Sequence, residues 1–191
     1  MTQKIKLYDI LDTSYKKPEE QKKQLSNYGY KYDSILSNDN EQVYYNPTTN
    51  KLIFNVSGSH TLKDWLVTDV DLALGKLKNT DRYKEAKQRL TQAKQKYNTD
   101  HATISGQSLG GSIAGYIGNR SDDVYTLNKG VTFGMKNRDN EKHYRQKNDI
   151  VSSISILNNQ KTNKLNNNHH FLDVINNHSI DNLKNSNIYI D

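Results

Sequence analysis

A serine held between glycines is the first feature of the chain that could do chemistry. Residues 106–110, Gly-Gln-Ser-Leu-Gly, match the pattern G-x-S-x-G. In this pattern the serine stands on a strand-to-helix turn so tight that larger neighbouring side chains would collide. The predicted strand HATIS precedes the turn, and the small-residue segment SIAGYIG, which can form a helix, follows it. This context favours a nucleophilic Ser108 over a purely structural Gly-Ser turn.

A serine nucleophile needs a histidine to accept its proton and an acid to orient that histidine. Downstream of Ser108 the chain has Asp149, in the segment NDIV, and then His169, His170 and His178. The order serine, acid, histidine is therefore available for a catalytic triad, with three candidates for the base.

Other reactive groups have plainer interpretations. The chain has no cysteine, which excludes disulfides, thiolate metal sites and a cysteine nucleophile. His169 and His170 could bind metal with Asp173, but no second ligand pair at metal spacing accompanies them, so neither a metal nor a cofactor is expected. The remaining histidines are expected at the surface or at strand starts, with His143 exposed in a charged run. Trp65 is expected in the core, and Asp64 and Asp69 are expected to be helix-surface or hydrogen-bonding groups.

The elements that must position these residues can be predicted from apolar spacing and turn residues. A helix is expected from near Pro18 to near Gly29, and two strands, QVYYN and KLIFNV, flank the turn at 46–50. The spacing of apolar residues over 62–74 and 83–97 predicts two amphipathic helices before the strand HATIS.

After the helix that follows Ser108, the segments DVYTLN and GVTFGM are expected to be short strands. The Asn-rich segment 157–168 is expected to be a long surface loop, 169–175 a strand and 176–183 a loop with a short helix. Strands that alternate with helices predict an α/β fold with a mainly parallel central sheet flanked by helices. We expect one minimal domain over residues 1–191, with a polar helical segment at 1–34.

Three segments together resemble the class 3, or fungal-type, lipases of the α/β-hydrolase superfamily. They are Phe54 to Asp69, Ile104 to Ala114, and Asn148 to Val151, and they lie within about residues 50–155. The resemblance implies Ser108 as nucleophile, Asp149 as orienting acid and Ser59 with the backbone N–H of Leu109 as the oxyanion hole. It favours His178, in a late His-Ser loop, as the base. The resemblance thins after Val151, so His169 and His170 remain alternatives.

The chain departs from the family pattern at three places. Gln107 stands where the family usually has histidine, and Ser57 where it usually has arginine. Ser152 and Ser153 replace the proline that follows the acid loop. None of these residues performs the chemistry, so the departures bear on supporting contacts. The short chain also implies a minimal sheet without an elaborate cap.

The resemblance implies a serine ester hydrolase, a lipase or phospholipase acting on a lipid or other acyl ester. The alternative is a catalytically inactive α/β-hydrolase fold that serves as a binding or structural module. The acyl chain, the head group and the oligomeric state stay open.

Charge and hydropathy narrow the expected partners. The formal charge is +6, but no dense basic block occurs, so we expect no nucleic-acid partner and at most weak association with anionic membrane surfaces. No apolar run reaches about 18 residues, and the first twenty residues lack the pattern of a secretory signal. A cytoplasmic location is expected.

Overall fold

A computed structural model of the chain describes residues 4–59, 77–130, 138–149, 161–166 and 178–190. Within these ranges seven strands form one sheet in the order β1 to β7. The strands are β1 Lys31–Tyr32, β2 Glu41–Asn46, β3 Lys51–Val56, β4 Thr103–Gln107, β5 Asp123–Leu127, β6 Glu141–Gln146 and β7 Asn163–Leu165. β1, β2 and β3 pair antiparallel, and β3 to β7 pair parallel. The predicted mainly parallel α/β sheet is confirmed.

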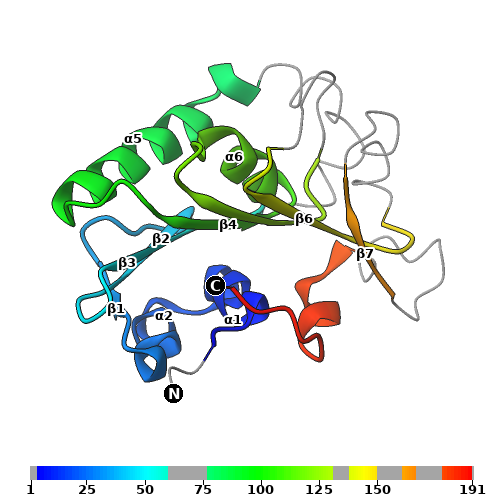
Figure 1. Cartoon of the computed structure of the whole chain (residues 1–191), viewed down its shortest axis with the longest axis horizontal. Coiled ribbons are helices and arrows are strands. Elements are labelled where there is room, and N and C mark those ends of the chain that lie inside the picture. The colour runs from blue at the N-terminus through cyan, green and yellow to red at the C-terminus, as the bar shows by residue number, and fades with distance from the viewer. Residues whose placement is uncertain (1–3, 60–76, 131–137, 150–160, 167–177, 191) are drawn as a thin grey trace.

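Helices cover both faces of this sheet (Figure 1). One face carries α5 Asp81–Lys96 and α6 Leu109–Ile117, and the other carries α1 Leu7–Leu11, α2 Pro18–Gln24 and the short 3-10 helix η5 Ile180–Leu183. Further 3-10 turns lie at η1 Asp12–Tyr15, η2 Ser26–Tyr28 and η3 Leu77–Asn79. The fold is thus a sheet between two helical layers.

The alternation of side chains along the strands builds the two cores. Phe54 of β3 packs with Leu90 of α5, while its neighbour Ile53 faces the opposite core. Val124 and Tyr125 of β5 divide in the same way. Successive residues of a strand point to opposite faces, so central strands that are apolar on both sides require helices on both sides.

Several predicted elements are present close to their expected limits. The hairpin of β2 and β3 turns at residues 47–50, where Asn50 has a φ of 53°. The helix expected over 83–97 is α5, which begins after Thr80, whose side chain accepts a hydrogen bond from the backbone of Tyr83. The helix expected from Pro18 is α2, and the segment ends at Gly29 with a φ of 81°.

Two expectations need correction. His143 is buried, with 1% of its surface exposed, because the charged run EKHYRQ forms β6 between β5 and β7 rather than a surface segment. The Asn-rich segment contains β7, whose pairing with β6 uses backbone groups and so tolerates polar side chains at a sheet edge. The N-terminal segment, expected to be helical, contains α1 as well as α2, and α1 buries Leu7, Ile10 and Leu11.

Some expectations fall on residues outside the described ranges. These are the helix over 62–74 with Trp65, Asp64 and Asp69, the strand over 169–175, and nearly all of the strand over 130–135. Among the helices that the structure does describe, none is long and apolar enough to span a membrane.

Candidate active site

Ser108 occupies a strained turn between β4 and α6. Its backbone has φ 55° and ψ −125°, a region that residues other than glycine rarely adopt. The Ser108 N–H donates to the carbonyl of Leu127 on β5 at 3.0 Å, and its own carbonyl accepts from Ser112 of α6 at 3.0 Å. The neighbouring strand and the helix therefore hold the turn from both sides.

The glycines of the motif allow this close approach. A β-carbon on Gly110 would lie 2.2 Å from the carbonyl oxygen of Val56, and one on Gly106 would lie 2.4 Å from that of Gly110. Both obstacles are backbone atoms, which cannot swing aside. The strand, turn and helix expected around Ser108 are thus all formed, with glycine where any side chain would collide.

His178 and Asp149 are in contact. Nδ1 of His178 lies 2.7 Å from Oδ1 of Asp149, and both side chains are fully buried. Asp149 follows β6 at a turn in which Asn148 has a φ of 67° and the Asp149 N–H donates to the Gln146 carbonyl at 3.3 Å. This geometry fixes the imidazole by one nitrogen and leaves the other, Nε2, for chemistry.

Two reactive atoms lack partners. Ser108 Oγ and His178 Nε2 are both buried, and neither has a hydrogen-bond partner in the described structure. The two atoms therefore do not bond to each other in this state. Catalytic hydrogen bonds are often long in unliganded proteins and shorten when substrate binds.

Gln107, the last residue of β4, attaches the His178 segment to that strand. Its Nε2 donates to the backbone carbonyl of His178, and its Oε1 accepts from the hydroxyl of Tyr15. Gln146 of β6 adds a second attachment, donating to the Ser179 carbonyl at 2.7 Å. Gln107, which stands where class 3 lipases usually have histidine, thus links the His178 backbone to the residue that precedes Ser108.

Tyr15 is a site residue that the sequence did not reveal. About half of its surface, 53%, is exposed. Its hydroxyl lies near Gly58, since a β-carbon placed on that glycine would be 3.9 Å from the hydroxyl oxygen. Although the ring is partly exposed, desolvation of its hydroxyl end raises the pKa of Tyr15 to about 12, with the Asp181 and Asp12 carboxylates adding to the effect. The hydroxyl therefore stays protonated at neutral pH and remains a donor to Gln107.

The expected oxyanion residues lie at the same edge of the sheet. Ser59, half-buried, stands three residues beyond β3, and Leu109 is the first residue of α6. β3 and β4 are parallel neighbours, with Val56 opposite Gly106, so their carboxyl ends are adjacent. A β-carbon on Gly58 would lie 3.6 Å from that of Ser108. The first N–H groups of a helix have no intrahelical acceptor and can stabilise negative charge.

An arginine from another part of the chain supports the Ser57 position. Arg82 of α5 donates to the Ser57 carbonyl at 2.9 Å and to the Asn40 side chain at 2.7 Å. The Ser57 hydroxyl donates to the Asp39 carbonyl at 3.0 Å. Ser57 stands where class 3 lipases usually have arginine. The guanidinium group of Arg82 nevertheless holds the loop that leads to Ser59.

The other histidines are separate from this site or outside the described ranges. His101 is exposed and lies 3.0 Å from the Asp123 carboxylate. His143 is buried on β6, and its two ring nitrogens have no partner in the described structure. His60, His169 and His170 fall outside the described ranges. Within those ranges no group of three histidine and carboxylate residues could hold a metal ion.

Comparisons with known proteins agree with this architecture. No protein-family model matches the sequence, and no curated protein matches it. Among solved structures, the Lip2 lipase of Yarrowia lipolytica aligns with a TM-score of 0.49 and 15% identity, over 77% of this chain and 72% of Lip2. The lipase of Rhizomucor miehei, in complex with its propeptide, aligns with a TM-score of 0.51 and 12% identity.

The second alignment covers 78% of this chain and 62% of the Rhizomucor enzyme, so the chain spans less than two thirds of that lipase. The likeness concerns the arrangement of the sheet and helices, since few residues are identical. Together with the mainly parallel sheet, it shows that this chain has an α/β-hydrolase-like fold, the fold of the Rhizomucor miehei lipase.

Proposed function

We propose that this protein is a serine ester hydrolase that cleaves acyl esters through Ser108, His178 and Asp149. The observation that carries the proposal is the pair of unpartnered buried atoms, Ser108 Oγ and His178 Nε2, with Asp149 holding the opposite side of the imidazole. A buried polar atom without a partner costs about 1–3 kcal/mol. Nucleophilic catalysis requires a positioned serine and an oriented imidazole. Ser108 and His178 provide these two groups, and each keeps a buried polar atom without a partner in the described structure.

The geometry supports a two-step reaction. His178 Nε2 accepts the Ser108 proton as Oγ attacks the ester carbonyl, while the Nδ1–H donates to Asp149. Ser59 and the backbone N–H of Leu109 stabilise the negatively charged oxygen of the tetrahedral intermediate. His178 then gives its proton to the leaving alcohol, which leaves an acyl group on Ser108. A water molecule that gives a proton to His178 then attacks the acyl carbon, the bond to Ser108 Oγ breaks, and His178 returns the proton to Oγ as the carboxylic acid leaves.

For the substrate we propose a lipid ester. The proposal is supported by the fold, which is that of a protein named as a lipase. A soluble acyl ester uses the same chemistry, and the two classes differ in whether the enzyme must meet an interface.

Hydrolysis of p-nitrophenyl butyrate by matched variants tests the proposed residues. Ser108→Ala and His178→Ala should each lower kcat/KM by roughly 10³-fold or more, the loss typical of triad members. Ser26→Ala, which alters an exposed serine bonded only to the Lys23 carbonyl, should leave it unchanged. His169→Ala and His170→Ala should have little effect.

Two results would contradict the proposal. Full activity in Ser108→Ala would place the nucleophile elsewhere. A folded wild-type protein that hydrolyses no acyl ester would favour the catalytically inactive binding module. Far-ultraviolet circular dichroism of each variant separates a lost reaction from a lost fold.

A further inference from the structure

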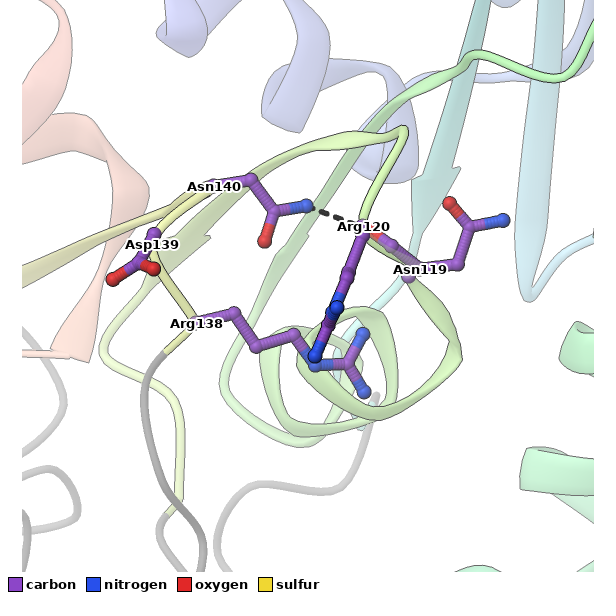
Figure 2. Close-up of a pocket in the computed structure, with 6 residues that line it drawn as sticks. Asn119, Arg120, Arg138, Asp139 and Asn140 are labelled. Atoms are coloured by element: carbon purple, nitrogen blue, oxygen red, sulfur yellow. Dashed lines mark hydrogen bonds between the residues drawn. The ribbon is translucent and has the colours of Figure 1, made fainter.

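A pocket lies at the opposite end of the parallel strands from Ser108. It has a volume of about 890 Å³ and is lined by residues 118–120, after α6, and residues 138–140, before β6 (Figure 2). Helix α6 separates it from the nucleophile, because Ser108 precedes that helix and Gly118 follows it. Nine helical residues span about 13 Å. The pocket is therefore distinct from the candidate active site.

Two arginines dominate this pocket. Figure 2 shows the side chains of Arg120 and Arg138 extending from different loops toward the same space. Arg120 is exposed and has no hydrogen bond or ion pair with any described residue. Arg138 donates one bond, to the Tyr116 carbonyl at 3.3 Å, and pairs with no carboxylate in the described structure. Two permanent positive charges thus face one pocket.

The nearby carboxylates do not balance these charges. Asp139 lines the pocket, but its carboxylate points away from both guanidinium groups in Figure 2. Asp122 lies 2.5 Å from the Lys94 ammonium and accepts from the backbone of Ala102 and Asn119, each at 2.9 Å. Its oxygens are therefore already engaged. Like charges repel, so the converging arginines favour an anion between them.

The backbone around the arginines is fixed before any ligand arrives. The Asn140 side chain donates to the Asn119 carbonyl at 2.7 Å, the bond drawn in Figure 2, and so ties the two loops together. The Glu141 N–H donates to the Arg138 carbonyl at 3.0 Å, which closes a turn at the start of β6. Such pre-organisation lowers the entropy lost on binding.

We propose that this pocket binds a phosphoryl group between Arg120 and Arg138. A carboxylate can satisfy one guanidinium fork, whereas a phosphoryl group has three oxygens and up to two negative charges and can engage both. The volume exceeds that of a phosphate ion alone and falls in the range of small-molecule sites, about 300–1,000 Å³. The ligand is thus a phosphorylated organic molecule, either free in solution or presented as a lipid head group.

Titration with three probes distinguishes these sources. The probes are inorganic phosphate, glycerol 3-phosphate, and phosphatidylcholine vesicles that contain phosphatidic acid. Binding is followed by calorimetry for the soluble probes and by co-sedimentation for the vesicles, at constant ionic strength. The variants are Arg120→Gln and Arg120→Gln/Arg138→Gln. The control is Lys51→Gln/Lys87→Gln, which removes the same charge from exposed positions outside the pocket.

We expect saturable binding that weakens roughly tenfold or more in Arg120→Gln and further in the double variant, with the control close to wild type. Binding of glycerol 3-phosphate would identify a soluble ligand, and binding confined to vesicles would identify a head group. Equal losses in the double variant and its control would overturn the proposal, because surface charge alone would then explain the attraction. Absence of binding to all three probes would overturn it as well. Arg120→Gln removes no bond within the described structure, so it tests the site even if the double variant fails to fold.

Discussion

At the scale of single residues, several buried groups are strained or have polar atoms without a hydrogen-bond partner in the described structure. Ser108 is strained and unpaired, His178 is paired on one side only, and His143 has neither ring nitrogen bonded within the described structure. The first two fit the proposed reaction. His143 belongs to β6, where it is buried near Lys129 and Arg145. Its effect should therefore appear in stability.

The buried His143 should make stability fall in mild acid. Burial, with Lys129 and Arg145 adding their charge, lowers the pKa of His143 from 6.5 to about 2. Below pH 6.5 the His143 ring is protonated in the unfolded chain but stays neutral in the folded chain. The stabilisation is present above pH 6.5 and is lost as the pH falls toward 2, by up to about 1.4 kcal/mol per pH unit.

Urea unfolding at pH 7 and pH 5 measures this effect. His143→Leu should lose less stability than the wild type over this interval, because no histidine remains there to titrate in the unfolded state. His101→Gln, which changes an exposed histidine, should keep the wild-type dependence. Identical pH dependence in His143→Leu and the wild type would show that His143 is readily protonated in the fold.

At the scale of elements, the end of β4 connects Ser108, the proposed nucleophile, to His178, the proposed base. Gln107 precedes Ser108, donates to the His178 carbonyl and accepts from Tyr15 of η1. Three segments distant in sequence therefore meet at one amide side chain. A misplacement of His178 by about 1 Å is enough to reduce turnover by about two orders of magnitude.

Loss of this connection should lower kcat more than it raises KM. Gln107→Leu removes both bonds and should reduce kcat for p-nitrophenyl butyrate by roughly 10- to 100-fold, because His178 is no longer held in position. Tyr15→Phe removes one bond and should have a smaller effect in the same direction. Tyr32→Phe, whose hydroxyl donates to Gln21 instead, is the matched control. An unchanged kcat in Gln107→Leu would mean that Asp149 alone positions the histidine.

The elements differ in how well the sequence predicted them. The turn at Ser108, the β2–β3 hairpin and α5 depend on local signals, namely glycines, turn residues and helical spacing, and these could be recognised. β6 could not be recognised, because its glutamate, histidine and arginine are typical of a solvated surface. In the fold Glu141 is buried and pairs with Lys129 in the core. The Tyr15–Gln107 bond joins residues 92 positions apart, and no local pattern encodes such a contact.

The residues of the candidate site also differ in how well the sequence predicts them. Ser108 carries a local motif, so its turn was predictable. The order of residues makes Asp149 a candidate acid and His178 one of three candidate bases, and only the resemblance favours His178; no sequence signal predicts the support from Arg82. That support depends on α5 packing over the sheet, which places a guanidinium group where the strand itself has serine.

At the scale of the whole molecule, the two ends of the chain close one face of the fold. Lys6 and Tyr189 form an antiparallel bridge, and the Leu7 N–H donates to the Ile188 carbonyl at 2.9 Å. In Figure 1 both ends lie on the face that carries α1 and α2. Because Tyr15 comes from one end and His178 from the other, the site should be sensitive to loosening of either terminus.

The net charge of +6 should influence which membrane surfaces the protein binds. If the substrate is a lipid, turnover should be higher on anionic than on neutral vesicles at low salt, since each basic residue that reaches the surface contributes roughly 1 kcal/mol. Added salt should reduce the difference by screening. Rates of lipid-ester hydrolysis on both vesicle types, with and without salt, provide the measurement. Equal rates on vesicles and on soluble short-chain esters, independent of salt, would instead indicate a soluble esterase.

The most direct test of the proposed activity is covalent labelling with a fluorophosphonate, followed by mass spectrometry of the intact protein and of its peptides. The proposal predicts one adduct per chain, mapped to Ser108, since a serine activated by His178 attacks phosphorus as it would attack an ester carbonyl. Ser108→Ala should take up no label while keeping the wild-type circular dichroism spectrum. Labelling that persists in Ser108→Ala, or a folded wild-type protein that takes up no label, would contradict the assignment of Ser108 as the nucleophile.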